Sequence, residues 1–317
     1  MPQPRGYVFG PVASRRYGKS LGVDLVRMKT CTFSCVFCQL GPTPPEGHVA
    51  ERTGDPPMPE ILASLRSWMA AHDAPDFITA GGSGEPTLHR DFGDVFRYVR
   101  GETGCSSLLL SNGSLFDRPE VRAEAALADV VKVSLGAWDG ESFGRLVRPA
   151  PGVAPFEKIL EGYRAFRESF AGRLDCEVFL VPGINDSEDA CRRIAGKIET
   201  FSPDTVSLNT AVRPGAEDWL RPVPKDRLDA LRGIFGPRAA EAGAEPQGGS
   251  VPGAVEPTPQ AVAELVSRHP VSVRALAAAT GLSERDVLAL AGEAGAVITA
   301  TGGERFVAMR GRDGIRG

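Results

Sequence analysis

The chain of 317 residues is 42% hydrophobic and 24% charged, a composition typical of a globular protein with room for one large α/β domain and a small appendage. Its 36 basic and 40 acidic residues give a net charge of −4, which argues against a uniformly basic nucleic-acid-binding surface. No run of about 18 apolar residues predicts a membrane span, and residues 1–20 lack the apolar core of a signal peptide. We therefore expect a cytoplasmic protein that does not contact a membrane.

Short apolar runs alternate with amphipathic helical patterns through residues 1–236. The expected strands are Leu21–Val26, Asp76–Ala80, Ser107–Leu110, Val130–Leu135, Cys176–Val181 and Thr205–Leu208. The expected helices are Ile61–Ala71, Phe92–Val99, Pro119–Leu127, Phe156–Phe170, Glu188–Thr200 and Lys225–Ile234. This alternation predicts an α/β fold, a partial (β/α)6 TIM-like barrel that binds its ligands at the C-terminal ends of parallel strands.

The remaining residues predict a linker and a small second module. Residues 237–258 are dominated by Ala, Gly, Pro and Glu without periodicity, which is typical of a flexible linker. Within 259–317, three short helical patterns are followed by two short strands around Gly302 and Gly303. Three helices and a β-wing predict a winged-helix-like module.

The third helix of this module is acidic, with Glu284, Asp286 and Glu293 against a single Arg285. A helix that enters a DNA groove needs positive charge to meet phosphate. We therefore expect the module to contact protein rather than DNA.

Three cysteines, Cys31, Cys35 and Cys38, stand in a C-x3-C-x2-C pattern on one short segment. In a reducing compartment, clustered thiols are ligands or catalytic groups before they are disulfides, and thiolates are soft ligands suited to iron–sulfur clusters. The alternative is a zinc site, but zinc usually takes four ligands in two pairs and this sequence has no second C-x2-C. Cys105, Cys176 and Cys191 are dispersed, and we interpret them as small buried hydrophobic residues.

The triplet resembles the motif of the radical SAM superfamily, with Phe37 at the aromatic position before the last cysteine. Gly81–Thr87 (GGSGEPT) resembles the glycine-rich element of that superfamily. The resemblance implies that the three cysteines hold a [4Fe–4S] cluster with one open iron, which binds S-adenosylmethionine (SAM) and cleaves it to a 5′-deoxyadenosyl radical. It also implies a set of SAM-binding residues: Phe37, Gly82, Ser83, Gly84, Glu85, Asn112, Ser134, Val181 and Gly183. Phe37 would pack on the adenine, and Glu85 would accept hydrogen bonds from the methionine amino group.

Residues 6–225 resemble one group within the superfamily, which is related to the wyosine-base synthases that modify transfer RNA. Those enzymes carry upstream cysteines for a second cluster, whereas this chain has no cysteine before Cys31. We therefore expect a single cluster and do not transfer their pyruvate chemistry.

Period-two alternation places Lys132 and Ser134 on one face of a strand. A site residue and a solvated lysine at the strand end are equally good interpretations of Lys132.

An anionic substrate pocket is one interpretation of four basic residues, Arg15, Arg16, Lys19 and Arg213. Solvated arginines, or salt bridges that hold the N-terminal segment down, are the alternative.

The leading functional hypothesis is a radical SAM oxidoreductase or transferase that abstracts hydrogen from an unidentified substrate. A one-electron reductant such as flavodoxin or ferredoxin would be its partner. A transfer RNA base-modifying enzyme and a glycyl-radical-enzyme activase are alternative enzymes. A metal-binding winged-helix regulator is the non-enzymatic alternative.

Overall fold

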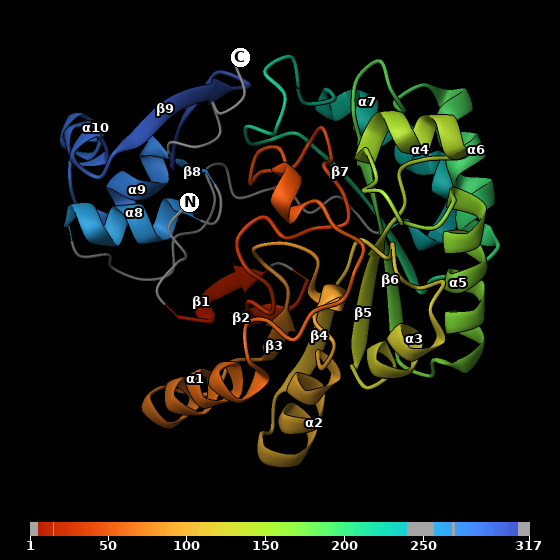
Figure 1. The fold of residues 1–317 in the computed structure, drawn as a ribbon. Helices are drawn as coiled ribbons and strands as arrows, with labels where there is room; N and C mark the ends of the chain where they lie inside the picture. Colours follow the sequence, from red (N-terminus) through yellow and green to blue (C-terminus); the bar gives the residue numbers. More distant parts are fainter. Residues whose placement is uncertain (1–5, 15, 240–256, 268–269, 310–317) are drawn as a thin grey trace.

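The computed structural model describes residues 6–14, 16–239, 257–267 and 270–309. Its larger sheet has seven strands that pair in sequence order, from β1 to β7 (Figure 1). Their bounds are β1 Val8–Ser14, β2 Gly18–Val23, β3 Phe77–Ala80, β4 Ser106–Leu110, β5 Val130–Ser134, β6 Arg173–Leu180 and β7 Thr205–Thr210. Strand β1 is antiparallel to β2, and every later pairing is parallel.

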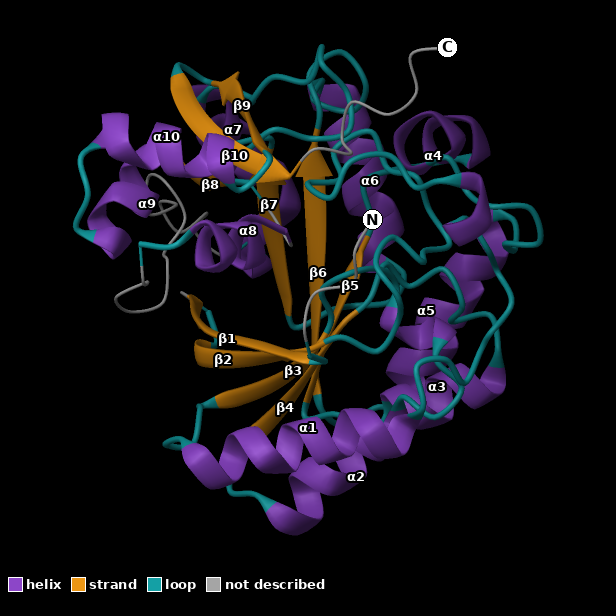
Figure 2. Cartoon of the chain, turned by 60° about the vertical axis from the view of Figure 1, so that its left-hand side comes forward, coloured by secondary structure: helices purple, strands orange, loops and turns teal. Residues whose placement is uncertain are grey.

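The helices that connect these strands cover one face of the sheet, which curves as a partial barrel (Figure 2). They are α1 Met58–Ala71, α2 Gly93–Glu102, α3 Pro119–Ala125, α4 Gly140–Val147, α5 Phe156–Ser169, α6 Glu188–Glu199 and α7 Lys225–Arg232. Short 3-10 helices occupy η1 Pro45–Gly47, η2 Pro86–Leu88 and η3 Gly233–Arg238. The predicted α/β fold with a partial TIM-like barrel is confirmed.

Alternation along β5 and β6 places apolar side chains on the outer face and charged or polar side chains on the inner face. On the outer face, Val131, Val133 and Val178 belong to the same buried cluster as Tyr163 and Phe166 of α5. The inner face carries Lys132 and Ser134 of β5 and, opposite Ser134 in the register, Glu177 of β6. The main hydrophobic core therefore lies between sheet and helices, whereas the inner face carries these polar side chains and a small separate cluster of Tyr17, Leu108 and Val130.

Among the strands and α-helices of the larger sheet region, two were not expected from the sequence. Strand β1 contains Gly10 and Pro11, which break a strand pattern, but an edge strand tolerates proline because one side of it needs no ladder partner. Helix α4 has eight residues, and Asp139 caps it by accepting a hydrogen bond from the Ser142 N–H at 2.8 Å. The first parallel strand also begins three residues earlier than expected, at Gly18.

The C-terminal domain has the element order of a winged helix, with its own antiparallel sheet in the order β8-β10-β9. Its elements are α8 Pro259–Ser267, β8 Val271–Ser272, α9 Val273–Thr280, α10 Glu284–Glu293, β9 Ala296–Thr301 and β10 Glu304–Met309. The two-residue β8 adds to the two strands expected, and a separate hydrophobic cluster that includes Val262, Leu276 and Val307 fills the domain. Most of the predicted linker (240–256) lies outside the described residues, whereas Ala239 still bridges to Val206 of β7.

Candidate cluster and cofactor site

The loop that carries the cysteine triplet follows β2 at the C-terminal edge of the parallel strands. The Cys31 N–H donates to the Gly47 carbonyl at 2.8 Å, and the Val49 N–H donates back to the Cys31 carbonyl at 3.2 Å. On the other side, the Val36 N–H donates to the Leu146 carbonyl of α4 at 3.1 Å. The loop is therefore fixed by backbone bonds to two distant segments before any ligand binds.

All three sulfurs are free thiols on partly exposed residues. Burial of the sulfur raises the pKa of Cys31 to about 12, and burial together with the charges of Cys31 and Cys38 raises that of Cys35 well above its usual value. Thiols in this state bind metal by exchanging their protons for it. Among the described residues, no three His, Cys, Asp or Glu side chains are placed to bind one metal ion. Three thiols on one short loop are nevertheless soft ligands of the kind that iron–sulfur clusters take.

The glycine-rich loop Gly81–Thr87 follows β3 and packs directly on the cysteine loop. The Lys29 N–H donates to the Ser83 carbonyl at 2.7 Å, and the Glu85 N–H donates to the Thr30 carbonyl at 3.0 Å. A Cβ at Gly84 would lie 1.9 Å from the Thr30 carbonyl oxygen, so only glycine permits this approach. The two predicted motifs are thus one structural unit.

Glu85 is almost fully buried, and its carboxylate is occupied by neighbours. Oε1 accepts from the Thr87 hydroxyl at 2.6 Å and the Ser111 hydroxyl at 2.7 Å, and Oε2 accepts from the Asn112 N–H at 2.7 Å. Burial raises the pKa of this carboxyl, although the donors oppose the rise. Glu85 therefore joins the ends of β3 and β4, and its expected contact with the methionine amino group stays a prediction.

Ser83 is the residue of this loop with unused hydrogen-bonding capacity. Ser83 is buried, and its N–H donates to Asp24 Oδ1 at 2.7 Å. Its hydroxyl has no hydrogen-bond partner within the described part of the chain. A buried hydroxyl without a partner is costly unless a ligand satisfies it. Ser83 and the exposed Gly82, whose φ of +136° few other residues adopt, fit a polar ligand such as SAM.

Asn112 links the end of β4 to the cysteine loop. Its Nδ2 donates to the Thr32 hydroxyl at 2.8 Å and lies 3.6 Å from the Cys31 sulfur. The backbone carbonyls of Asn112 and Ser134 both accept from the Tyr163 hydroxyl, each at 3.1 Å. Tyr163 was not predicted as a site residue because its helical spacing indicates only core packing, yet it joins the two strand ends.

Phe37 stacks on Phe179 of β6, with ring centroids 4.1 Å apart and an angle of 10° between the planes. One face of the Phe37 ring is therefore covered by protein, which leaves its other face or edge for the expected adenine contact. Phe179 lies on the inner face, next to Glu177 in the alternation of β6. No pattern in the sequence separates Phe179 from the ordinary core residues of that strand.

The turn after β6 is organised by Asn185, which the sequence did not single out as a ligand-site residue. Its Oδ1 accepts from the Val181 N–H at 2.7 Å, and its Nδ2 donates to the Gly136 carbonyl at 2.8 Å. Gly183 is exposed at the turn with a φ of +74°, and its N–H donates to Asp186 Oδ1 at 2.8 Å. Val181 and Gly183 are thus held in place beside β5, but both N–H groups are already used.

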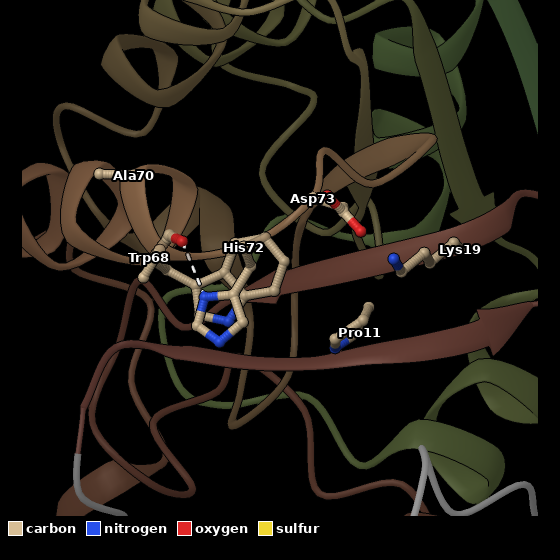
Figure 3. Close-up of a pocket in the computed structure, with 7 residues that line it drawn as sticks. Pro11, Lys19, Trp68, Ala70, His72 and Asp73 are labelled. Carbon is tan, nitrogen blue, oxygen red and sulfur yellow. Dashed lines mark hydrogen bonds between the residues drawn. The ribbon is translucent and has the colours of Figure 1, made fainter.

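Of the four basic residues of the expected substrate pocket, the three that the structure describes do not come together. Arg15 lies outside the described residues, and Arg16 is exposed in the turn between β1 and β2. Lys19 lies on the outer side, where it lines a surface hollow with Trp68 and His72 of α1 and the adjoining loop (Figure 3). Arg213 reaches the cysteine loop instead, with its Nη1 3.3 Å from Gln39 Oε1.

A charged pair that the sequence did not identify occupies the inner face. Lys132 Nζ and Glu177 Oε2 are 3.0 Å apart, and each side chain is about one-fifth exposed, at 18% and 19%. Burial alone would raise the pKa of Glu177, but Lys132, together with Arg16 and Asn209, lowers it below its usual value. The carboxylate is therefore ionised at neutral pH, and the pair places both charge signs below the cysteine loop.

The fold and these loops agree with a comparison to known families: a family model described as the Radical SAM superfamily matches residues 25–198. The chain belongs to the radical SAM superfamily. The match begins before the cysteine loop and ends in α6, so it includes the cysteine loop, the glycine-rich loop and the turn after β6. The assignment expected from the sequence is confirmed.

Two relatives show how far the likeness of this radical SAM protein extends. It is 35% identical to the UPF0026 protein slr1464 of Synechocystis, over 65% of this chain and 76% of that protein. It is 32% identical to the GTPase Obg of Brachyspira hyodysenteriae, over 72% of this chain and 33% of that protein. The chain thus spans one third of the length of the second relative.

Among solved structures, a radical SAM methyltransferase from Sphaerobacter thermophilus superimposes with a TM-score of 0.50 at 20% identity. The match covers 70% of this chain and 65% of that one. At this identity the likeness concerns the fold alone.

Proposed function

We propose that this radical SAM protein holds a [4Fe–4S] cluster through Cys31, Cys35 and Cys38 and uses SAM to abstract hydrogen from a substrate on the inner face. The observation that supports the proposal is the direct packing of the cysteine loop on the Gly81–Thr87 loop at the C-terminal edge of the sheet. A thiol site alone fits several metals. A thiol site joined to a glycine-rich loop with a buried unpartnered hydroxyl also provides for a polar ligand.

When bound, the cluster supplies the electron that cleaves the sulfonium of SAM and yields a 5′-deoxyadenosyl radical. The residues of the chain would bind SAM and orient it. Ser83 and Gly82 would meet the polar end of SAM, and Asn112 and Ser134 its ribose or carboxylate. Phe37, backed by Phe179, would pack on the adenine.

The inner face is where a substrate would meet the radical. It lies below the strand ends and carries Lys132, Glu177 and Asn209, with Arg16 acting electrostatically on Glu177. Fixed charges of both signs select a polar substrate and orient it before reaction. The fate of the substrate radical would then decide whether the enzyme is an oxidoreductase or a transferase.

Anaerobic reconstitution with iron and sulfide tests the proposal. We expect a [4Fe–4S] absorption and EPR spectrum that changes when SAM is added, and 5′-deoxyadenosine after reduction. Cys35→Ala should lose the cluster, whereas Cys105→Ala, at the opposite end of β4, should keep it. A wild-type protein that binds one zinc ion and does not respond to SAM would contradict the proposal.

We also propose flavodoxin or ferredoxin as the electron donor. None of the described helices is long and apolar enough to cross a membrane.

For the C-terminal domain we propose a role in contacting protein. Helix α10 begins with Glu284 and Asp286, and Glu284 pairs with Arg305 of the wing at 2.7 Å. Because acidic charge repels phosphate, the full chain should show no tight, salt-dependent DNA binding in a filter assay. Such binding would reverse this assignment.

A further inference from the structure

A buried lysine lies directly against the cysteine loop. Lys29 is 3% exposed and precedes Cys31 by two residues. Its ammonium donates to the Cys38 sulfur at 3.4 Å and to the Gly41 carbonyl oxygen at 2.5 Å. These two acceptors are a sulfur and a carbonyl oxygen, not a carboxylate. A buried cation needs a countercharge, and the thiolates of a cluster-loaded cysteine loop would supply one.

The backbone of Lys29 is fixed independently of its side chain. Its φ of +62° lies in the left-handed region, which an L side chain rarely adopts unless the surroundings enforce it. The Lys29 N–H is held by the Ser83 carbonyl at 2.7 Å. The position therefore keeps a long basic side chain where a glycine would fit the backbone better, which points to a use for the ammonium.

The ammonium of Lys29 lies directly against one of the proposed cluster ligands, because its Nζ donates to the Cys38 sulfur. A [4Fe–4S]2+ core with three thiolates carries a net charge of −1, and uptake of one electron makes it −2 with no bond broken. A fixed positive charge beside the ligands stabilises the more negative state more strongly.

We propose that Lys29 is a positioning residue that raises the reduction potential of the cluster held by Cys31, Cys35 and Cys38. The inference rests on the proposed function, because it needs the cluster. Charge and hydrogen bonds to the sulfurs are among the factors that set such potentials. The ammonium thereby makes the one-electron reduction by a flavodoxin- or ferredoxin-type donor easier.

An anaerobic redox titration followed by EPR tests the role of the charge. Lys29→Met keeps the Cβ and the apolar stem and removes only the ammonium, whereas Lys29→Arg keeps the charge. We expect the reduced-to-oxidised ratio of the Lys29→Met cluster at a fixed potential to fall about tenfold, which is about 59 mV for one electron. Lys29→Arg should stay closer to the wild type. Lys197 pairs with Glu157 on the surface, so Lys197→Met should have the reduction potential of the wild type.

The outcomes separate the inference from the proposed function. A wild-type protein that takes up no [4Fe–4S] cluster contradicts both. A loaded Lys29→Met protein with the wild-type potential overturns the inference alone, as does an equal shift in Lys29→Met and Lys29→Arg. If Lys29→Met loses its cluster, Lys29→Gln, which keeps a neutral donor toward Cys38, is titrated instead. A wild-type potential in that variant also overturns the role of the charge.

Discussion

At the scale of single residues, the inner face is defined by charged side chains on neighbouring strands, Lys132 of β5 and Glu177 of β6. Alternation in β5 placed Lys132 and Ser134 on one face, and the register confirms it. The contact of Lys132 with Glu177 joins residues 45 apart in the chain, and no local pattern specifies such a pair. The same limit explains why Asn185 and Tyr163 were missed, since each acts through distant backbone groups.

The Lys132–Glu177 pair gives a pH-dependent prediction. The pKa of Glu177 is lowered in the folded protein, so its contribution to stability is present above the usual carboxyl pKa of about 4.3 and is lost as pH falls through the folded value. Lys132→Met leaves the carboxylate without its partner, and burial then raises its pKa. We expect a loss of about 1–3 kcal/mol at pH 7, below the cost of a fully buried pair because both side chains are partly exposed.

Urea unfolding at pH 7 and at pH 4.5 measures this loss. The deficit should shrink at the lower pH, because protonation of Glu177 removes the unpaired charge. The double variant Lys132→Met/Glu177→Gln should recover part of the stability at pH 7. A deficit that is equal at both pH values would show that Lys132 contributes by packing alone.

At the scale of elements, the sequence identified the cysteine and glycine-rich loops but not how they depend on each other. The resemblance implies that Gly84 binds SAM, which stays a prediction. The structure gives a further reason for glycine at this position, because the missing side chain lets the Thr30 carbonyl approach. The sequence could not show this, because the requirement arises from the packing of two loops more than fifty residues apart.

Replacement of Gly84 by alanine tests that dependence. The added Cβ would lie 1.9 Å from the Thr30 oxygen, so the loops must separate. We expect Gly84→Ala to lose about 1–3 kcal/mol of stability by overpacking and to retain less iron after reconstitution. Gly196→Ala is the matched control, since it lies within α6 with no atom within 4 Å of its Cβ. It should gain about 0.5–1 kcal/mol. Equal iron content in both variants would contradict the mutual dependence.

At the scale of the whole molecule, the alternation of strands and helices was enough to predict the partial barrel. It did not predict how the sheet is tied together across its inner face. The turn that joins β1 to β2 brings Tyr17 to Asp175 of β6, where the Tyr17 hydroxyl donates to Oδ2 at 2.8 Å. Asp175 is buried and also accepts from Arg173 and Thr205. Gly10 and Pro11 interrupt the strand pattern of β1, so the β1–β2 hairpin that makes this contact possible was not predicted from the sequence.

This contact links segments 158 residues apart, so its loss should lower the stability of the whole barrel. Tyr17→Phe should cost about 1–3 kcal/mol near pH 7, because it leaves a buried acceptor short of a donor. Tyr7→Phe is the control: the Tyr7 hydroxyl binds Glu60 on the surface, and its loss should stay within about 0.5 kcal/mol.

The same contact gives a pH-dependent prediction. Burial and the charge of Asp175 raise the pKa of Tyr17 far above its usual value. Above about pH 10 the unfolded tyrosine ionises while the folded one cannot, so the wild type loses stability there and its advantage over Tyr17→Phe shrinks. Urea unfolding at pH 8 and pH 10.5 measures both effects, and an advantage that stays constant with pH would show that Tyr17 is not held neutral against Asp175.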